Sequence, residues 1–410
     1  MTIKISDIED AQNVLKDTII PTPILPDNKL SEKIGANAFL KAECLQRGGS
    51  FKIRGAFNKI SRLNDDEKKR GVVAASAGNH AQGVALAASL NGIKSTIVLP
   101  EYAPLTKVMA TKNYGADVIL HGSSFDEAMN YSFELAEKFG YTHIHAFDDE
   151  QIIAGQGTIG LEIKDDLPQV DAVVVPIGGG GIISGIAIAL KHFLPNVRII
   201  GVEAKNFAVI KDSLETGLPN AEKLKLTIAD GIAVKSPGKI TLEIIREYVD
   251  EIVEVTEEEI ANAIFHCVAN NRLVVEGAGA AGVAALLANK IELSENETVC
   301  AVLCGGNIDA NLLARILEQV LVRQSRYITL KVLVQDRPGR LAKLLDIVSG
   351  KGANVIEVFH RRAMYLAPLG QVGIEMLLEV RDEEHGNEIY NELQNLGYQV
   401  AREEPGEWDE

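Results

Sequence analysis

Residues 48–56 of the chain read Gly48-Gly49-Ser50-Phe51-Lys52-Ile53-Arg54-Gly55-Ala56. One lysine lies here among apolar neighbours and beside a flexible pair of glycines. A surface lysine would normally have polar or charged neighbours. Burial disfavours the charged form of an ammonium and lowers its pKa, which frees the amine to act as a nucleophile or a base. A structural lysine whose stem packs on apolar surface would show the same pattern. The stretch therefore makes Lys52 a candidate catalytic amine, and the motifs downstream decide between the two interpretations.

A second motif, Ser76-Ala-Gly-Asn-His-Ala-Gln-Gly83, follows an apolar strand and opens a helix. The backbone N–H groups at the start of a helix bind anions, and a glycine such as Gly78 lets a ligand come close to the backbone. A plain helix cap by Ser76 or Asn79 is the simpler interpretation of the same residues.

Four consecutive glycines, Gly178 to Gly181, also stand between a strand and a helix. They offer no side chains for packing, but their N–H groups can surround a phosphate, and the helix dipole adds to the attraction. A dinucleotide-binding loop is the rival interpretation, although its fingerprint is a weak signal. No lysine follows as in a nucleoside-triphosphate loop, so that chemistry is not expected.

A fourth motif, Val302-Leu-Cys304-Gly-Gly-Asn307, ends an apolar strand. Read from the residues alone, Cys304 is a small buried hydrophobe, which is the usual environment of a free cysteine. Glu276, in Val275-Glu-Gly-Ala-Gly-Ala, could lie near the same site, but an acid at a helix N-terminus is the simpler interpretation.

In this order the four motifs resemble the fold-type II pyridoxal-phosphate lyases, and the serine/threonine dehydratases in particular. The resemblance implies that Lys52 holds the cofactor covalently and then acts as the general base. It implies that Asn79 bonds the ring hydroxyl and that Cys304 contacts the ring nitrogen. The remaining implied contacts are Phe51, Gly178, Gly179, Gly180, Gly181 and Ile182 with the cofactor, and Ser76, Ala77, Gly78, Asn79 and His80 with the substrate.

Two departures from the family pattern matter. Serine racemases carry a second serine where this chain has Ala77, which disfavours racemisation and favours elimination. Some relatives bind a structural cation at the position of Glu203, but a second acidic ligand is replaced by Val209. A monovalent or divalent cation at Glu203 is therefore a speculative expectation.

The spacing of apolar runs predicts two domains. Short β-branched runs alternate with helical patterns over residues 1–323, which is typical of doubly wound parallel sheets covered on both faces. Residues 327–403 instead show the order β-α-β-β-α-β of a ferredoxin-like domain. Its Asp336-Arg-Pro-Gly turn and Gly352-Ala-Asn-Val segment resemble the ACT regulatory domain.

Composition limits the partners and the compartment. A net charge of −16 argues against nucleic acid, because binding phosphates needs clustered basic residues. The four cysteines show no zinc spacing and fit a reducing cytoplasm. An acidic N-terminus and the lack of a long apolar stretch predict neither a signal peptide nor a membrane span.

The expected function is that of a threonine (serine) ammonia-lyase. It would form 2-oxobutanoate from threonine and pyruvate from serine, and it would take part in isoleucine biosynthesis. The ACT resemblance implies an amino-acid effector and a homodimer or homotetramer. The alternatives are another reaction of the fold, namely serine racemase or threonine synthase, and an inert sensor whose ACT-like domain binds an amino acid.

Overall fold

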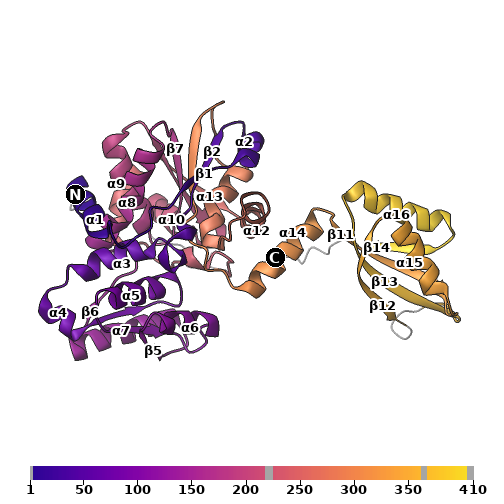
Figure 1. Cartoon of the computed structure of the whole chain (residues 1–410), viewed down its shortest axis with the longest axis horizontal. Coiled ribbons are helices and arrows are strands. Elements are labelled where there is room, and N and C mark those ends of the chain that lie inside the picture. Colours follow the sequence, from indigo (N-terminus) through magenta and orange to yellow (C-terminus); the bar gives the residue numbers. More distant parts are fainter. Residues whose placement is uncertain (1–2, 218–224, 362–366, 404–410) are drawn as a thin grey trace. The chain divides into compact units, whose positions relative to one another are not determined.

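The computed structural model of the chain describes residues 3–217, 225–361 and 367–403. The chain forms two compact units, Met1–Asp309 and Ala310–Glu410. The first contains two sheets of mainly parallel strands among helices, and the second contains one antiparallel sheet (Figure 1). This architecture confirms the α/β prediction and the antiparallel character of the second domain.

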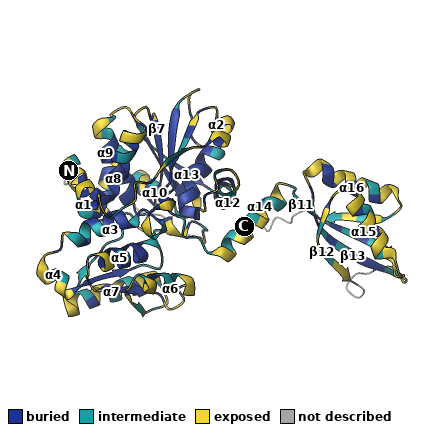
Figure 2. Ribbon diagram, in the orientation of Figure 1, coloured by how far each residue is buried: buried dark blue, intermediate teal, exposed yellow. Residues whose placement is uncertain are grey.

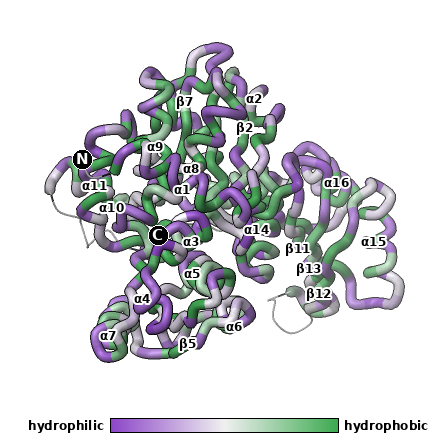
Figure 3. Tube along the Cα trace, turned by 60° about the vertical axis from the view of Figure 1, so that its left-hand side comes forward, coloured by the Kyte–Doolittle hydropathy of each residue, from purple (hydrophilic) through white to green (hydrophobic). Residues whose placement is uncertain are grey.

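The larger sheet of the first unit has six strands in the order β1-β2-β10-β7-β8-β9, and all neighbours are parallel except β1 and β2. Strands β7 and β10 are buried along their whole length (Figure 2). A strand covered on both faces needs apolar side chains at successive positions, and β7 is accordingly hydrophobic throughout (Figure 3). The strands are β1 (Ile24–Pro26), β2 (Asn37–Lys41), β7 (Ala172–Pro176), β8 (Arg198–Ala204), β9 (Glu251–Val255) and β10 (Thr298–Val302).

The smaller sheet has the order β5-β4-β3-β6 and is parallel throughout. Successive residues of a strand point to opposite faces. Val72 and Ala74 thus pack with helices α3 and α5, while Val73 and Ala75 pack with α7. These elements are β3 (Val72–Ala75), β4 (Ser95–Leu99), β5 (Asp117–Leu120), β6 (Thr142–His143), α3 (Lys52–Ser61), α4 (Asp65–Arg70), α5 (Asn79–Leu90), α6 (Leu105–Asn113) and α7 (Phe125–Phe139).

Two helices of the larger lobe, α8 (Glu150–Asp166) and α9 (Gly181–Phe193), approach each other closely through glycines. A Cβ added to Gly185 would lie 2.4 Å from the carbonyl oxygen of Ile153 and 2.5 Å from the amide nitrogen of Gly157. The contact therefore requires glycine, and it fixes the start of α9 against α8. The remaining helices of this unit are α1 (Ile5–Leu15), α2 (Asn28–Ile34), α10 (Val209–Thr216), α11 (Lys239–Tyr248), α12 (Glu257–His266) and α13 (Gly277–Leu287).

The second unit has the order β-α-β-β-α-β that the sequence predicts. Its sheet is antiparallel in the order β12-β13-β11-β14 and has a hydrophobic core of its own. The sequence sets the domain boundary after residue 323, whereas in the structure α14 (Ala310–Arg323) groups with the second unit. The other elements are β11 (Tyr327–Gln335), α15 (Arg340–Gly350), β12 (Asn354–Arg361), β13 (Gln371–Glu379), α16 (Glu383–Asn395) and β14 (Gln399–Glu403).

Within the described residues, no helix combines the length and the apolar character that crossing a membrane requires.

Candidate active site

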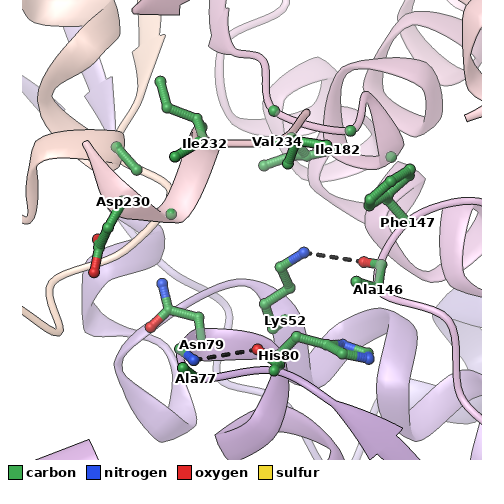
Figure 4. Close-up of a pocket in the computed structure, with 18 of the residues that line it drawn as sticks. Lys52, Ala77, Asn79, His80, Ala146, Phe147, Ile182, Asp230, Ile232 and Val234 are labelled. Atoms are coloured by element: carbon green, nitrogen blue, oxygen red, sulfur yellow. Dashed lines mark hydrogen bonds between the residues drawn. The ribbon is translucent and has the colours of Figure 1, made fainter. Parts of the chain in front are cut away.

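A cavity of about 450 Å³ brings the four sequence motifs together. Its walls include the segments that directly follow β3, β6, β7 and β10, together with the start of α3. Ligands of open α/β sheets bind at this position, outside the carboxyl ends of the strands. Figure 4 shows Lys52 reaching into the cavity between Asn79 and Ile182.

Lys52 is the first residue of α3 and projects into this cavity. Its Nζ donates a hydrogen bond to the carbonyl oxygen of Ala146 at 3.0 Å and lies 5.0 Å from the centre of the Phe51 ring. Burial lowers the pKa of Lys52 to about 8, although the thiol of Cys304 and the carboxyl of Glu276 favour its charged form. The neutral amine that the sequence predicts is therefore accessible near neutral pH.

The loop after β3 presents the start of α5 to the cavity. Gly78 occupies the N-cap position without a side-chain cap, and its N–H bonds the hydroxyl of Ser76 at 3.2 Å. The first N–H groups of α5 are thus available to an anion. The imidazole of His80 is buried against the carbonyl oxygen of Ile144. Burial and the nearby Lys52 lower the pKa of His80 to about 3, so the ring is neutral, and its contact with the substrate stays a prediction.

The glycine loop after β7 provides a cradle made of backbone. Gly180 has a φ of 90°, which favours glycine, and α9 begins at the next residue. A Cβ at Gly179 would lie 2.3 Å from the ring of Phe147, and Thr241 Oγ1 donates to the carbonyl oxygen of Gly179 at 2.7 Å. The loop is therefore held from both sides at the positive end of a helix dipole.

Cys304 lies in the cavity wall with 3% of its surface exposed. Burial, together with the carboxyl of Glu276, holds the pKa of this thiol well above its usual value. Its carbonyl oxygen accepts a hydrogen bond from the N–H of Phe51 at 3.2 Å, which joins the fourth motif to the first. The cavity thus presents a neutral thiol at this position.

These residues fit pyridoxal phosphate. Gly178 to Gly181 line the cavity without side chains that would fill it, and the Phe147 ring lies where a Cβ of Gly179 would be. Lys52 supplies an amine in the same cavity, and Asn79 and Cys304 supply polar groups without a strong charge.

Glu276 and Asn307 belong to the same wall, although an acid at a helix N-terminus was the simpler interpretation of Glu276 and Asn307 only ends a motif. Glu276 is the N-cap residue of α13, and its Oε1 accepts a hydrogen bond from Asn79 Nδ2 at 2.5 Å. Burial and the carboxyl of Asp230 raise the pKa of Glu276 to about 7. The simple interpretation of Glu276 as a helix acid was therefore incomplete, because its carboxyl makes no capping hydrogen bond to α13 and instead bonds Asn79 in the cavity wall.

The sequence also gives no signal for residues 230–236 and for Phe147, which line the cavity. Lys107 of α6 forms an ion pair with Asp230, and Lys235 forms one with Asp126 of α7 at 2.9 Å. The segment is thus connected to helices around the smaller sheet. A loop of this kind lacks the periodicity that identifies a helix or a strand, so only the fold shows that it borders the cavity.

Directly behind Lys52 lies a buried network of charges. Arg54 is fully buried and pairs with Glu43 at 2.8 Å and with Glu162 at 2.6 Å, and Lys41 pairs with Glu162 at 2.5 Å. Burial alone would raise the pKa of Glu43, but the Arg54 guanidinium together with Thr22 and Lys41 holds this pKa below its usual value. The network joins β2, α3 and α8 beneath the helix that carries Lys52.

Glu203, the candidate cation ligand, is buried at the end of β8. Its two carboxylate oxygens accept hydrogen bonds from the N–H groups of Ile210 at 2.8 Å and Lys211 at 2.9 Å. Burial raises its pKa to about 7. Among the described residues no group of three or more His, Cys, Asp or Glu side chains is arranged to hold a metal. A cation at Glu203 stays a prediction, and the structure shows it as a cap of the following helix.

Known families and structures show what this chain is similar to. A family model of pyridoxal-phosphate dependent enzymes matches residues 15–305. An L-threonine ammonia-lyase of Thermotoga maritima is 50% identical over 398 residues, which cover 97% of this chain and 99% of the relative. The L-threonine dehydratase catabolic TdcB of Staphylococcus aureus is 47% identical over 322 residues, or 78% of this chain and 93% of the relative.

Solved structures show the same fold. The processed threonine deaminase isoform 2 of Solanum lycopersicum superposes with a TM-score of 0.71 at 39% identity, over 76% of this chain and 87% of that chain. Maize serine racemase gives a TM-score of 0.74 at 35% identity, over 79% of this chain and all of that chain. The chain therefore belongs to the pyridoxal-phosphate-dependent enzymes of fold type II and, within them, to the threonine ammonia-lyase family.

Proposed function

We propose that the protein deaminates L-threonine to 2-oxobutanoate and ammonia, and L-serine to pyruvate and ammonia. The observation that carries this proposal is the 50% identity to an L-threonine ammonia-lyase over 97% of the chain. The cavity supports it, because Lys52 lies there together with the anion-binding loops that a phosphorylated cofactor and an amino-acid carboxylate require.

Each cavity residue has a role in this proposal. Pyridoxal phosphate, when bound, supplies the electron sink that makes the Cα proton of the amino acid acidic. The loop from Gly178 to Ile182 holds its phosphate, with Phe51 and Asn79 beside its ring. The N–H groups of residues 76–80 bind the substrate carboxylate. Lys52 removes the Cα proton at Nζ, and its lowered pKa leaves the neutral amine ready to accept it.

The reaction balances as an elimination of water followed by hydrolysis. The Cα–H bond breaks with its proton passing to Lys52 Nζ, and Lys52 returns a proton to the departing β-hydroxyl, which leaves as water. The enamine that is released takes up water and forms the 2-oxo acid and ammonia. The neutral thiol of Cys304 favours this course, because an uncharged partner leaves the ring a weaker sink and favours prompt loss of the leaving group.

Serine racemisation is the second candidate, since maize serine racemase shares the fold at 35% identity. Racemisation needs a second acid or base on the face of the substrate opposite Lys52. Ala77 occupies the position where the racemases carry a serine. Its methyl group cannot exchange a proton, so elimination is the favoured outcome.

We further propose that the ACT-like second domain makes the enzyme allosteric, with isoleucine or valine as the effector and a role in isoleucine biosynthesis. A homodimer or homotetramer is part of this proposal, because domains of this kind tend to pair. The independent core of the second unit supports a separate regulatory module.

The test is turnover of L-threonine by purified protein, followed as 2-oxobutanoate with and without isoleucine. Turnover that isoleucine inhibits supports both the lyase and the regulation, and turnover that is indifferent to isoleucine supports the lyase alone. Lys52→Ala should lower kcat at least about 100-fold, the low end of what a general base contributes, and should abolish the visible absorbance of the bound cofactor. A Lys52→Ala protein that kept both would overturn the assignment.

A further inference from the structure

The side-chain amide of Asn79 is held at both ends. Its Oδ1 accepts a hydrogen bond from Asn307 Nδ2 at 2.8 Å, and its Nδ2 donates to Glu276 Oε1 at 2.5 Å. An amide group presents donors on one side and an acceptor on the other, and its orientation is decided by its partners. Asn79 therefore has one orientation that satisfies both neighbours.

The orientation of Asn307 is itself fixed by the backbone. Its Nδ2 donates to the carbonyl oxygen of Gly48 at 2.8 Å as well as to Asn79. A carbonyl oxygen only accepts, so rotating this amide by 180° would place two acceptors against each other. The chain of hydrogen bonds thus runs from Asn307 through Asn79 to Glu276, with a carbonyl at one end and a carboxyl at the other.

The three hydrogen-bonded side chains approach the backbone of neighbouring glycines closely. A Cβ at Gly49 would lie 2.3 Å from Asn307 Oδ1, and one at Gly305 would lie 2.2 Å from Glu276 Oε1 and 3.0 Å from Asn79 Nδ2. Gly48 and Gly49 both have positive φ, 76° and 72°. The glycine pair before Lys52 therefore places a carbonyl oxygen under Asn307 and makes room for its side chain.

We infer that Asn307 and Glu276 are positioning residues, which orient the Asn79 amide so that its second Nδ2 proton faces the cofactor ring. This inference rests on the proposed cofactor contact of Asn79. With Asn307 donating to Oδ1, the amide nitrogen must lie on the other side, and Glu276 takes only one of its two protons. The remaining proton is the one available to an oxygen in the cavity. Neither positioning residue needs to touch the cofactor itself.

A double-mutant cycle on cofactor affinity tests the inference. Asn307→Asp keeps the shape but replaces the donor with an acceptor, so the Asn79 amide must turn and present oxygen to Glu276. The dissociation constant for pyridoxal phosphate, titrated by absorbance into cofactor-free protein, should rise about tenfold. Asn79→Ala should cause a similar loss. Adding Asn307→Asp to Asn79→Ala should then weaken binding by less than about threefold more, because the residue to be positioned is gone.

Glu276 provides a second arm that does not depend on how well Asn307→Asp folds. Glu276→Gln retains an acceptor oxygen and should bind the cofactor nearly as wild type does, whereas Glu276→Leu should lose about tenfold. The melting temperature of each cofactor-free variant is measured beside its affinity. Affinity losses that add independently of Asn79, or wild-type affinity in Asn307→Asp and Glu276→Leu, would overturn the inference.

A separate measurement tests the proposed function. Threonine turnover by the wild-type protein tests the reaction, and the affinity cycle tests the positioning. If Asn79→Ala leaves the cofactor affinity unchanged while the wild type turns over threonine, the inference fails and the lyase stands. If the wild type binds the cofactor without turning over threonine, the reaction fails and the cycle still decides the positioning.

Discussion

The ε-amine of Lys52 should be unusually reactive in the cofactor-free protein. Burial lowers its pKa to about 8, and each unit of lowering increases the neutral fraction at neutral pH about tenfold. The rate at which an acylating reagent modifies Lys52 should therefore rise up to about pH 8 and level off above it. Peptide mass spectrometry over a pH series measures this rate.

Lys29 serves as the internal control for that experiment. Its hydrogen bond and ion pair with Glu32 raise the pKa of Lys29, so its modification rate should continue to rise beyond the pH at which Lys52 levels off. Parallel profiles for the two lysines would contradict the assignment of a desolvated amine at Lys52.

Arg54 should be essential for the stability of the first unit. Replacing one member of a buried ion pair leaves its partner charged and desolvated, which costs about 3–5 kcal/mol. Arg54→Met leaves the buried Glu43 without its ion-pair partner, while Glu162 keeps its ion pair with Lys41. The free energy of unfolding, from urea denaturation monitored on this unit, should fall by about that amount.

Lys69→Ala is a matched control, because it breaks an ion pair with Asp66 whose side chains are 77% and 78% exposed. Water and salt screen such a pair, so the free energy of unfolding, measured in the same urea experiment, should not change. Equal stability of the two variants would show that the buried network contributes nothing specific.

For single residues, the sequence identifies those whose unusual chemistry is evident from their neighbours along the chain. Lys52 stands out because an amine among apolar residues is unusual, and the tetraglycine stands out because packing cannot explain it. The partnership of Glu276 and Asn307 with Asn79 is not visible in this way. Their partner Asn79 is 197 and 228 residues away along the chain, so only the fold reveals the chain of hydrogen bonds.

The glycine loop at the start of α9 gives the sharpest test at the scale of an element. Gly179 has an ordinary φ, so alanine is allowed by the backbone, but its Cβ would meet the Phe147 ring at 2.3 Å. Gly179→Ala should therefore displace the loop and weaken binding of pyridoxal phosphate at least about tenfold, since loop N–H groups would lose their hydrogen bonds. Absorbance titration of the cofactor-free protein measures the loss.

Two further variants separate the clash from other effects. Phe147→Ala combined with Gly179→Ala removes the atoms that collide and should recover part of the affinity. Gly350→Ala in α15 has no atom within 4 Å of the added Cβ and should leave affinity unchanged. Failure of the double variant to recover any affinity would mean that the loop needs glycine at this position for another reason.

Element boundaries show where local pattern stops being informative. Taken by itself, the stretch Ala38-Phe-Leu-Lys-Ala-Glu-Cys44 predicts one short strand, but β2 ends at Lys41 and a short helical turn covers Glu43–Leu45. Lys41 pairs with Val302, the last residue of β10, so the sheet offers no partner beyond it. Burial of Glu43 against Arg54 then sets the direction of the chain. The hydrophobic pattern of the sequence reveals neither the end of β10 nor the ion pair of Glu43.

At the scale of the whole molecule, the alternation of strands and helices was sufficient to predict the two fold classes. Parallel strands covered on both faces have continuous apolar runs, whereas β11 alternates buried and half-buried residues because only one of its faces is covered. The assembly of the strands of the first unit into two sheets that share one cavity could not be predicted from this alternation. It depends on which strand ends meet, and a pattern along the chain does not contain that information.

The two units should be separable. The second unit surrounds its own core, which includes Leu330, Met376 and Leu393, and about 100 residues are enough for an independent domain. Residues 310–410 expressed alone should therefore unfold in a single cooperative transition, followed by circular dichroism during heating. Residues 1–309 alone should keep the cavity and its threonine turnover but lose any response to isoleucine, because the site proposed for the effector belongs to the other unit. If the fragment 310–410 showed no cooperative transition, its core would depend on the first unit. If isoleucine still inhibited residues 1–309, the effector site would lie in the catalytic unit instead.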